Sequence, residues 1–308
     1  MSAMYLEHFS LSERPFSLTP DTQFFFNQQS HRDALNTILV SVKHSEGFIK
    51  IVGEVGTGKT LLCRKLLSVL SGSCFTCYIP NPYLSPDELK AFLAAEICAD
   101  VSPDMPNHQL LLAIYRRLLQ MARKGKQVVL VVDEAQAMPR ETIESLRLLT
   151  NLETEKRKLL QIVLLGQPEL DTLLDRPDLR QLKQRIVFSE YLRPYSVLGT
   201  RRYLKHRLVA AGNNAALFSR SSEWLMAKAS GGVPRLINIL AHKALLVAYG
   251  KGDHRVGSLH MAQAISDTSE TTGLGKLLAL RWHLLWPVVG GFSAAALIVM
   301  PSWFGSVL

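Results

Sequence analysis

Eight consecutive residues carry the clearest chemical signal in the chain. The pattern G-x-x-x-x-G-K-[ST] is matched at every specified position by Gly53, Glu54, Val55, Gly56, Thr57, Gly58, Lys59 and Thr60. Glycines let the backbone turn tightly enough for N–H groups to face phosphate oxygens, and a helix beginning near Leu61 would turn its partly positive end to the same anion. Lys59 would bind the β and γ phosphates, and the Thr60 hydroxyl would hold Mg²⁺. The loop therefore predicts a site for ATP and Mg²⁺, against the alternative of a chance glycine turn.

Two acidic residues supply the next candidate groups. The segment 127–133 reads Q-V-V-L-V-V-D, an apolar run ending in Asp133, which is typical of a strand buried on both faces of a parallel sheet. Ligands of open α/β sheets bind at the carboxyl edge, where Asp133 and Glu134 would lie. Asp133 could orient the water shell of Mg²⁺, and Glu134 could polarise the water that attacks the γ phosphate. A solvated turn is the other interpretation of such a pair.

Gln167 is a third candidate, because it follows another apolar run, 159–165. At the tip of a strand beside the nucleotide edge, its amide could contact the γ phosphate or the attacking water. Spacing alone leaves open the alternative of an ordinary loop glutamine.

The elements that must position these groups alternate along the chain as far as Pro194. Apolar runs predict five strands, at 48–52, 73–79, 127–133, 159–165 and 186–191. Amphipathic segments between them predict helices at 30–43, 61–70, 86–99, 108–123, 140–152 and 179–185. After Pro194 the pattern changes to helices alone, at 196–211, 221–230, 233–249 and 259–266. The expected fold is a parallel five-stranded α/β sheet with helices on both faces, followed by an all-helical unit.

The same changes in pattern set the expected domain boundaries. Residues 1–27 are rich in aromatic and turn residues and are expected to pack by their rings. The predicted units are an N-terminal arm and helix packing on the nucleotide-binding unit (1–45), the α/β unit (46–194), the helical unit (195–270), a basic linker (271–281) and a transmembrane helix (282–306).

The end of the chain differs in composition from the rest. From Trp282 to Leu308 there is no Lys, Arg, Asp or Glu, and about twenty residues around 284–300 are apolar enough to span hydrocarbon. Lys276 and Arg281 precede this run, so the positive-inside tendency keeps the N-terminal part in the cytoplasm. The first residues lack the apolar core of a cleaved signal peptide. We expect a single-pass anchor in the inner (cytoplasmic) membrane, with a buried C-terminal helix or an interfacial hairpin as the alternative.

Positive charge is concentrated before this run. Residues 196–281 contain 12 Lys and Arg against 4 acids, a net charge of +8, whereas residues 1–195 contain 23 against 22, a net charge of +1. Attraction to anionic lipid explains this position, since juxtamembrane basic residues contribute about 1 kcal/mol each near such a surface. Nucleic acid is the competing partner, but the sequence has no RNP-type aromatics, zinc finger or basic heptads.

Four cysteines occur in the chain, and their spacing matches no disulfide framework, which indicates a reducing compartment. Cys74 and Cys77 form C-x-x-C, but a zinc site there would lack further ligands, because no second pair or histidine lies near. Buried strand thiols are therefore the expected state of this pair, and a metal or redox site is the alternative.

Taken together, the phosphate loop, the D-E strand, the polar strand tip and the helical unit resemble the AAA+ ATPases over residues 1–269. The resemblance implies that the helical unit is a lid over the nucleotide. In the box L-K-Q-R-I, Arg185 matches the position of an arginine finger that serves a neighbouring subunit, with Arg180 as its rival. In G-G-V-P-R, Arg235 matches the sensor-2 arginine of the lid, which lies over the phosphates. Both arginines could instead be ordinary surface or ion-paired residues.

Five segments are more closely similar to the general secretion pathway protein A (ExeA) type of ATPase. They are H-F-S-L-S-E-R-P-F-S-L-T-P-D (8–21), G-E-V-G-T-G-K-T (53–60), V-V-D-E-A-Q (131–136), G-Q-P-E-L (166–170) and R-Q-L-K-Q-R-I (180–186). Within this type, a short chain ending in a membrane segment is most similar to the branch associated with the mannose-sensitive haemagglutinin (MSHA) type IV pilus. Secretion-type members continue into a periplasmic peptidoglycan-binding domain, whereas little follows Phe304, so peptidoglycan binding is not expected.

The resemblance implies a membrane-anchored ATPase that forms homo-oligomers with shared ATP sites. It would assist assembly of an MSHA-like pilus or a related secretion complex, with inner-membrane components as partners and without nucleic acid. A second hypothesis is an ATP-dependent scaffold with little hydrolysis, which would use the same pocket. A third is a DNA-transposition or partition helper, which the predicted anchor disfavours.

Overall fold

The computed structural model describes residues 2–102, 105–155, 157–273 and 277, which belong to two compact units. An α/β unit spans Pro20–Arg193. Among the described residues, a helical unit combines 2–19 with 194–273. The second crossing between the units thus lies where the sequence pattern changes from alternating strands and helices to helices alone.

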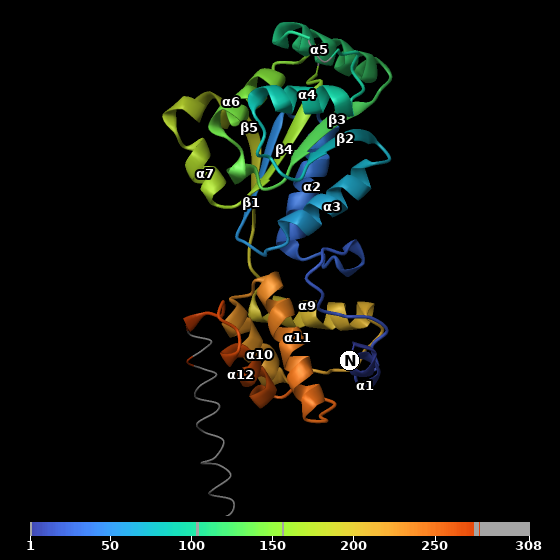
Figure 1. Cartoon of the computed structure of the whole chain (residues 1–308), viewed down its shortest axis with the longest axis vertical. Helices are drawn as coiled ribbons and strands as arrows, with labels where there is room; N and C mark the ends of the chain where they lie inside the picture. The colour runs from blue at the N-terminus through green and yellow to red at the C-terminus, as the bar shows by residue number, and fades with distance from the viewer. Residues whose placement is uncertain (1, 103–104, 156, 274–276, 278–308) are drawn as a thin grey trace, which may run out of the picture. The chain divides into compact units, whose positions relative to one another are not determined.

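Five parallel strands form the sheet of the α/β unit in the order β2-β3-β4-β1-β5. Their bounds are β1 Phe48–Gly53, β2 Cys74–Ile79, β3 Gln127–Val132, β4 Leu160–Gly166 and β5 Ile186–Leu192. β1 and β4 are buried at every residue, because helices cover both faces of a parallel sheet. The predicted α/β fold with a parallel five-stranded sheet is confirmed (Figure 1).

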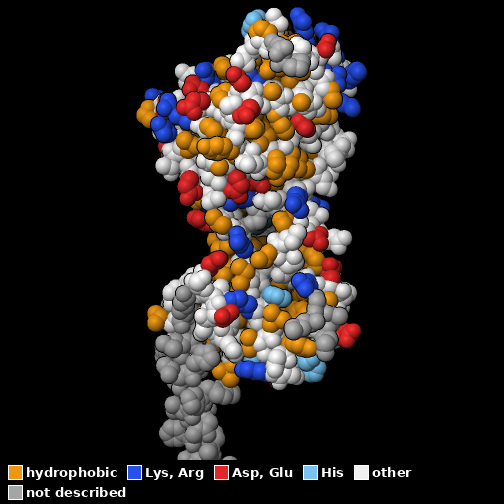
Figure 2. All heavy atoms as spheres, in the orientation of Figure 1, with side chains coloured by type: hydrophobic (Ala, Val, Ile, Leu, Met, Phe, Trp, Pro, Cys, Tyr) orange, Lys and Arg blue, Asp and Glu red, His pale blue; other side chains and the backbone are white. Residues whose placement is uncertain are grey.

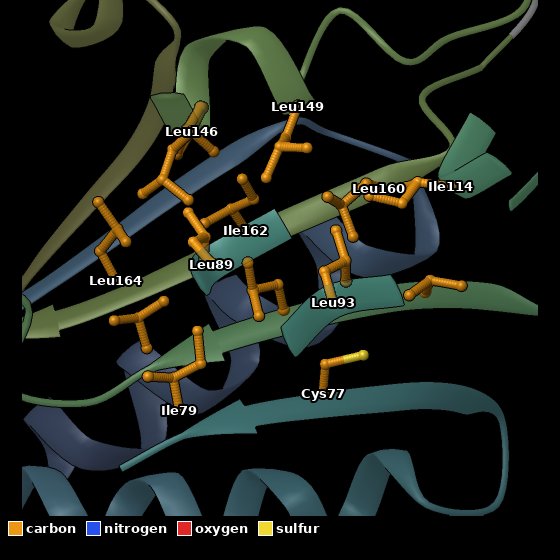
Figure 3. Close-up of a cluster of buried hydrophobic side chains, with 14 of the residues drawn as sticks. Cys77, Ile79, Leu89, Leu93, Ile114, Leu146, Leu149, Leu160, Ile162 and Leu164 are labelled. Carbon is orange, nitrogen blue, oxygen red and sulfur yellow. The ribbon is translucent and has the colours of Figure 1, made fainter. Parts of the chain in front are cut away.

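Two helices cover one face of the sheet and a larger group covers the other (Figure 1). The first face packs against α2 (Gln29–Lys43) and α3 (Lys59–Leu70). The second packs against α4 (Pro86–Glu96), α5 (Asn107–Arg123), α6 (Arg140–Leu149), α7 (Glu169–Leu174) and α8 (Arg180–Lys183). Figure 3 shows Leu89 and Leu93 of α4 over Ile162 of β4. Each such side chain contributes about 1.5–3 kcal/mol on burial, so this packing holds the sheet and its edge in place.

Local sequence accounts for both ends of α4. Ser85 caps its start, since the Ser85 hydroxyl accepts from the Glu88 N–H at 3.3 Å and the Glu88 carboxylate accepts from the Ser85 N–H at 2.7 Å. The helix ends at Glu96 and not at the expected residue 99. Cys98 has a φ of 51°, a left-handed conformation that cannot continue a helix.

Three short 3₁₀ turns complete the α/β unit, at η1 Thr22–Phe24, η2 Ala135–Ala137 and η3 Pro177–Leu179. Elsewhere its surface carries a local concentration of positive charge on α5 and the turn that follows. Arg116, Arg123, Lys124 and Lys126 are exposed there, and Figure 2 shows Lys and Arg side chains gathered on this part of the surface. Residues 1–195 therefore contain a basic surface region, although their net charge is only +1.

The helical unit contains α1 Ser2–His8, α9 Val197–Ala210, α10 Arg220–Ser230, α11 Pro234–Gly250 and α12 Ser258–Ser266. The N-terminal segment packs on these helices. The Arg207 guanidinium donates to the Pro15 carbonyl oxygen, and the Ser12 N–H donates to the Ala211 carbonyl oxygen at 2.9 Å. Phe9 and Phe16 are buried in the same unit, with the Phe16 and Phe218 ring centroids 5.9 Å apart.

This packing corrects the expected segment 1–45. Its first nineteen residues belong to the helical unit, and only the remainder, including α2, packs on the α/β unit. The aromatic rings explain the difference, because an apolar arm is buried by whichever surface offers a matching apolar face, and the sequence does not name that surface.

The predicted membrane anchor, 282–306, lies outside the described residues. Within the part of the chain that the structure describes, none of the helices is both long enough and apolar enough to cross a bilayer.

The C-x-x-C cysteines lie in β2 and contribute to different faces of the sheet. Cys77 is fully buried in the cluster beneath α4, whereas Cys74 packs against the cluster beneath α2 and α3. Side chains three residues apart in a strand point to opposite faces, so these two sulfurs do not converge on one ligand. Burial raises the pKa of the Cys77 thiol to about 12, and that of Cys63 on α3 likewise to about 12.

We therefore predict selective alkylation of the native protein. At pH 8, iodoacetamide should modify the exposed Cys98 quickly, while Cys63 and Cys77 should react only after unfolding, because they are buried and protonated. Peptide mass spectrometry over a time course measures each site. A Cys98→Ser variant, which lacks the fast site, is the control, and fast labelling of Cys77 in the folded protein would contradict the assignment.

Candidate nucleotide-binding site

The loop Gly53–Thr60 joins the carboxyl end of β1 to the first turn of α3. Gly56 and Gly58 have φ angles of 79° and 100°, which residues other than glycine rarely adopt. The Thr57 hydroxyl and N–H both donate to the Glu54 carbonyl oxygen, at 2.7 and 3.2 Å, and close the turn. The first N–H groups of α3 have no acceptor within the helix, so this end of α3 is suited to bind an anion.

Two glycines of the loop also lie in close packing. A Cβ at Gly53 would lie 2.6 Å from Thr57 Oγ1, and a Cβ at Gly58 would lie 3.1 Å from His31 Nε2. His31 of α2 is 3% exposed, and its Nε2 lies 2.9 Å from the Thr57 carbonyl oxygen. Since a carbonyl only accepts, the ring donates from Nε2. Burial lowers the pKa of His31, against the effect of this hydrogen bond, so the ring is neutral near pH 7. Sequence reasoning missed this support of the loop.

Lys59 is the buried cation of the site. The residue is 4% exposed, and its ammonium donates to the carbonyl oxygens of Gly53 and Glu54 at 2.8 and 3.2 Å. Burial lowers the pKa of Lys59, while the carboxylates of Glu134 and Asp133 act in the opposite direction. A buried ammonium bound by neutral oxygens is incompletely compensated, so a phosphate anion would be a favourable partner.

Asp133 and Thr60 bring side-chain oxygen atoms together at the same edge. Asp133 is 2% exposed, and its Oδ1 accepts from the Glu134 N–H at 3.0 Å. Burial raises the pKa of Asp133, against hydrogen bonds from the Thr60 side chain and the Glu134 backbone. A carboxylate and a hydroxyl brought together in this way fit Mg²⁺, which prefers hard oxygen ligands.

Glu134 turns the chain out of β3 with a φ of 51°. Its Oε2 accepts hydrogen bonds from the amide nitrogens of Gln167, at 2.9 Å, and Gln136, at 2.6 Å. Burial alone would raise the pKa of Glu134, but these two amides and the Lys59 charge hold it below its ordinary value. The carboxylate is therefore ionised at neutral pH, as a proton acceptor must be.

Gln167 directly follows β4, the strand between β3 and β1, and the structure brings its side chain to Glu134. A contact of Gln167 with the γ phosphate stays a prediction. Gln136 was not singled out from the sequence. Its signal was weak: a polar residue between Ala135 and Ala137, two positions after Glu134.

The other predicted contact residues lie within the loop or directly after it. Glu54 and Val55 are exposed, and Leu61 is half-buried in the first turn of α3. Their backbone groups, more than their side chains, are positioned to take part in phosphate binding.

Arg185 lies at the opposite edge of the sheet. Its Nη1 donates to the Arg147 carbonyl oxygen at 3.1 Å and to Thr150 Oγ1 at 2.7 Å, and so satisfies the end of α6. Arg185 directly precedes β5, and the first residue of β5 pairs with the first residue of β1. The phosphate loop follows the last residue of β1, so the length of that strand separates Arg185 from the loop of its own unit. Arg180 is exposed at the start of α8. A role for either arginine in a neighbouring subunit stays a prediction.

Arg235 is exposed in the first turn of α11, within the helical unit. The turn before it is shaped by packing, because a Cβ at Gly232, where φ is 78°, would lie 2.0 Å from the Tyr195 carbonyl oxygen. A contact between Arg235 and the phosphates, as a sensor-2 arginine would make, stays a prediction.

Comparison with known proteins agrees with this geometry. Residues 42–174 match the family model of the AAA domain. The chain is also 37% identical, over 98% of its length, to general secretion pathway protein A of Aeromonas hydrophila. It spans 54% of that relative, about half of its length.

Solved structures show the same fold at low sequence identity. The Aeropyrum pernix ORC2 protein, in its ADPNP-ADP complexes, superposes with a TM-score of 0.61 at 14% identity, over 84% of this chain and 74% of that chain. Cdc6p from Pyrobaculum aerophilum superposes with a TM-score of 0.60 at 17% identity, over 84% of this chain and 70% of that chain. The RuvB Holliday junction branch migration motor of Thermotoga maritima superposes with a TM-score of 0.53 at 17% identity, over 82% of this chain and 72% of that chain. The strand order and these matches show that residues 42–174 have the P-loop, AAA-type fold.

Proposed function

We propose that this chain is an ATPase that hydrolyses ATP with Mg²⁺ at the cytoplasmic face of a membrane and assists assembly of a secretion complex or an MSHA-type pilus. One observation carries the enzymatic part. Lys59, Thr60, Asp133 and Glu134 meet at one edge of the sheet and supply a cation, two metal ligands and a base.

Each group has its own task in this proposal. The loop N–H groups would hold the phosphate oxygens, and Lys59 would neutralise charge on the β and γ phosphates. Thr60 and Asp133 would hold Mg²⁺, which when bound offsets the charge that develops during phosphoryl transfer. Glu134 would accept a proton from the attacking water, which then adds to the γ phosphorus as ADP leaves.

The biological setting rests on sequence similarity. The relative with 37% identity is named for general secretion. The MSHA-type pilus, with MshM as its ATPase, is the finer setting that we propose from the resemblance of the sequence to that branch. Membrane attachment rests on the uncharged run at 282–306 and the basic residues before it. Homo-oligomers with shared sites would explain why an arginine stands at the edge of the sheet far from the loop of its own subunit.

The first prediction separates binding from hydrolysis. Lys59→Ala should weaken binding of a fluorescent ATP analogue by roughly 30-fold or more, because losing one partner of a buried charge pair costs about 2–5 kcal/mol. Lys65→Ala, on the same helix, is the matched control and should bind normally. Equal affinities of the two variants would count against the proposed loop chemistry.

The second prediction concerns the base. Glu134→Gln should bind ATP with near-normal affinity but lower the rate of phosphate release about 10²- to 10⁴-fold, since the amide cannot take a proton. Release by the full-length chain is measured under single-turnover conditions. A fully active Glu134→Gln would exclude Glu134 as the base, and a wild type that binds ATP without releasing phosphate would favour the scaffold hypothesis.

The third prediction tests catalysis between subunits. Mixing Arg185→Ala with Glu134→Gln should recover phosphate release, because a mixed interface would pair an intact Glu134 with an intact arginine. Arg180→Ala mixed in the same way tests the rival. Arg185→Ala should also lower the unfolding midpoint, since it removes the hydrogen bonds to Arg147 and Thr150. Arg180→Ala should leave the midpoint unchanged, because Arg180 is exposed. No recovery in either mixture would rule out both arginines.

A DNA-linked helper ATPase is the second candidate function. The net charge of +8 over 196–281 favours it, as does structural similarity to the Aeropyrum pernix ORC1 protein in complex with DNA, at a TM-score of 0.57 and 19% identity. Duplex binding that weakens steeply with salt would support this candidate, and its absence would leave the membrane proposal in place.

A further inference from the structure

The Gln136 side chain bridges the ends of two strands. Its amide nitrogen donates to Glu134 Oε2 at 2.6 Å, and its amide oxygen accepts from the Gln167 backbone N–H at 2.9 Å. The Gln167 side chain donates to the same Glu134 oxygen at 2.9 Å. These three hydrogen bonds form a closed network between the residue after Asp133 and the residue after β4.

The chemistry of the groups fixes the orientation of this amide. A backbone N–H can only donate, so the Gln136 oxygen must face Gln167 and its nitrogen must face Glu134. The backbone supports the arrangement, because the Ala137 N–H donates to the Glu134 carbonyl oxygen at 2.9 Å in the turn that carries Gln136. The packing at position 166 is tight, since a Cβ there would lie 3.2 Å from the Gln136 oxygen and 2.7 Å from Leu170 Cδ2.

The network uses one oxygen of the Glu134 carboxylate, Oε2, and makes no hydrogen bond to the other, Oε1. Within the described residues, the hydrogen bonds to the Glu134 carboxylate all reach Oε2. Two donors on Oε2 restrict rotation of the carboxylate and leave Oε1 available as the proton acceptor. A base held in one orientation has less rotational freedom to lose when the reaction occurs.

We propose that Gln136 is a positioning residue for ATP hydrolysis, which orients the Glu134 carboxylate and ties it to Gln167. This inference rests on the proposed ATPase function and adds a residue to it. The alternative is that Gln136 only joins the ends of β3 and β4 as structural support. The two differ in one respect: a positioning residue acts on the rate through Glu134, whereas structural support acts independently of it.

The first experiment compares turnover with binding in the full-length chain. Gln136→Ala should lower kcat about 10- to 100-fold, the range for residues that orient a reacting group, while Kd for a fluorescent ATP analogue changes less than about threefold. Gln136→Asn, shorter by about 1.5 Å, should lose the same activity because it cannot reach both partners. Gln136→Glu should be impaired too, since it replaces the donor with a second negative charge. Gln109→Ala, an exposed glutamine on α5, is the matched control.

The second experiment asks whether Gln136 acts through Glu134. In the Glu134→Gln background, adding Gln136→Ala should leave the residual single-turnover rate unchanged. A further 10- to 100-fold loss in that background would overturn the proposal, as would normal kcat in all three Gln136 variants. Unfolding midpoints identify any variant that is simply destabilised, and Gln136→Asn or Gln136→Glu then decides the outcome. Wild type without phosphate release would overturn the proposed function and this inference with it; active wild type with active variants would overturn the inference alone.

Discussion

The parallel alignment of the five strands is the constraint on which the site depends. Because all strands run the same way, their carboxyl ends meet at one edge, and adjacent strands lie only about 4.8 Å apart. The register pairs Val52 of β1 with Gly166 of β4, and Val132 of β3 with Leu164 of β4. The phosphate loop, the Asp133-Glu134 pair and Gln167 therefore leave the sheet side by side. The strand order places β4 between the other two, so Gln167 lies next to the base.

Burial gives the charges at this edge their importance. Asp133 and Lys59 are nearly inaccessible, and in both cases loss of solvent is the largest influence on the pKa, disfavouring the charged form. Each charge is partly compensated by the other and by neighbouring hydrogen bonds. A site with incompletely solvated charges of both signs is complementary to a polyphosphate and its metal ion, since these supply the missing partners. Glu134, less deeply buried and held by two amides, stays ionised beside them.

The chain crosses between its two units twice. Residues before Pro20 and after Arg193 both belong to the helical unit, so the α/β unit is tied to it at both of its ends. Prolines at positions 20 and 194 stand at these crossings and restrict the backbone there. The N-terminal arm is fixed on the helices by Arg207 and by buried rings, so it acts as part of that unit.

The sequence by itself determined the features that local pattern encodes. Apolar runs, and in 73–79 an alternating pattern, predicted all five strands to within a residue or two. The glycine-rich motif and the acids after a buried strand predicted that Lys59, Thr60, Asp133 and Glu134 form one candidate site. It did not indicate α1 or α7, which are too short to show a helical period.

Only the tertiary structure decided which distant residues support that site. His31 bonds to Thr57, 26 residues away, and Gln136 bonds to Gln167, 31 residues away. It also decided that the N-terminal arm packs on the helical unit and that Cys74 and Cys77 face opposite sides of the sheet. The reason is physical: these contacts arise from the packing of elements against one another, and neither periodicity nor a short motif specifies which surfaces will meet.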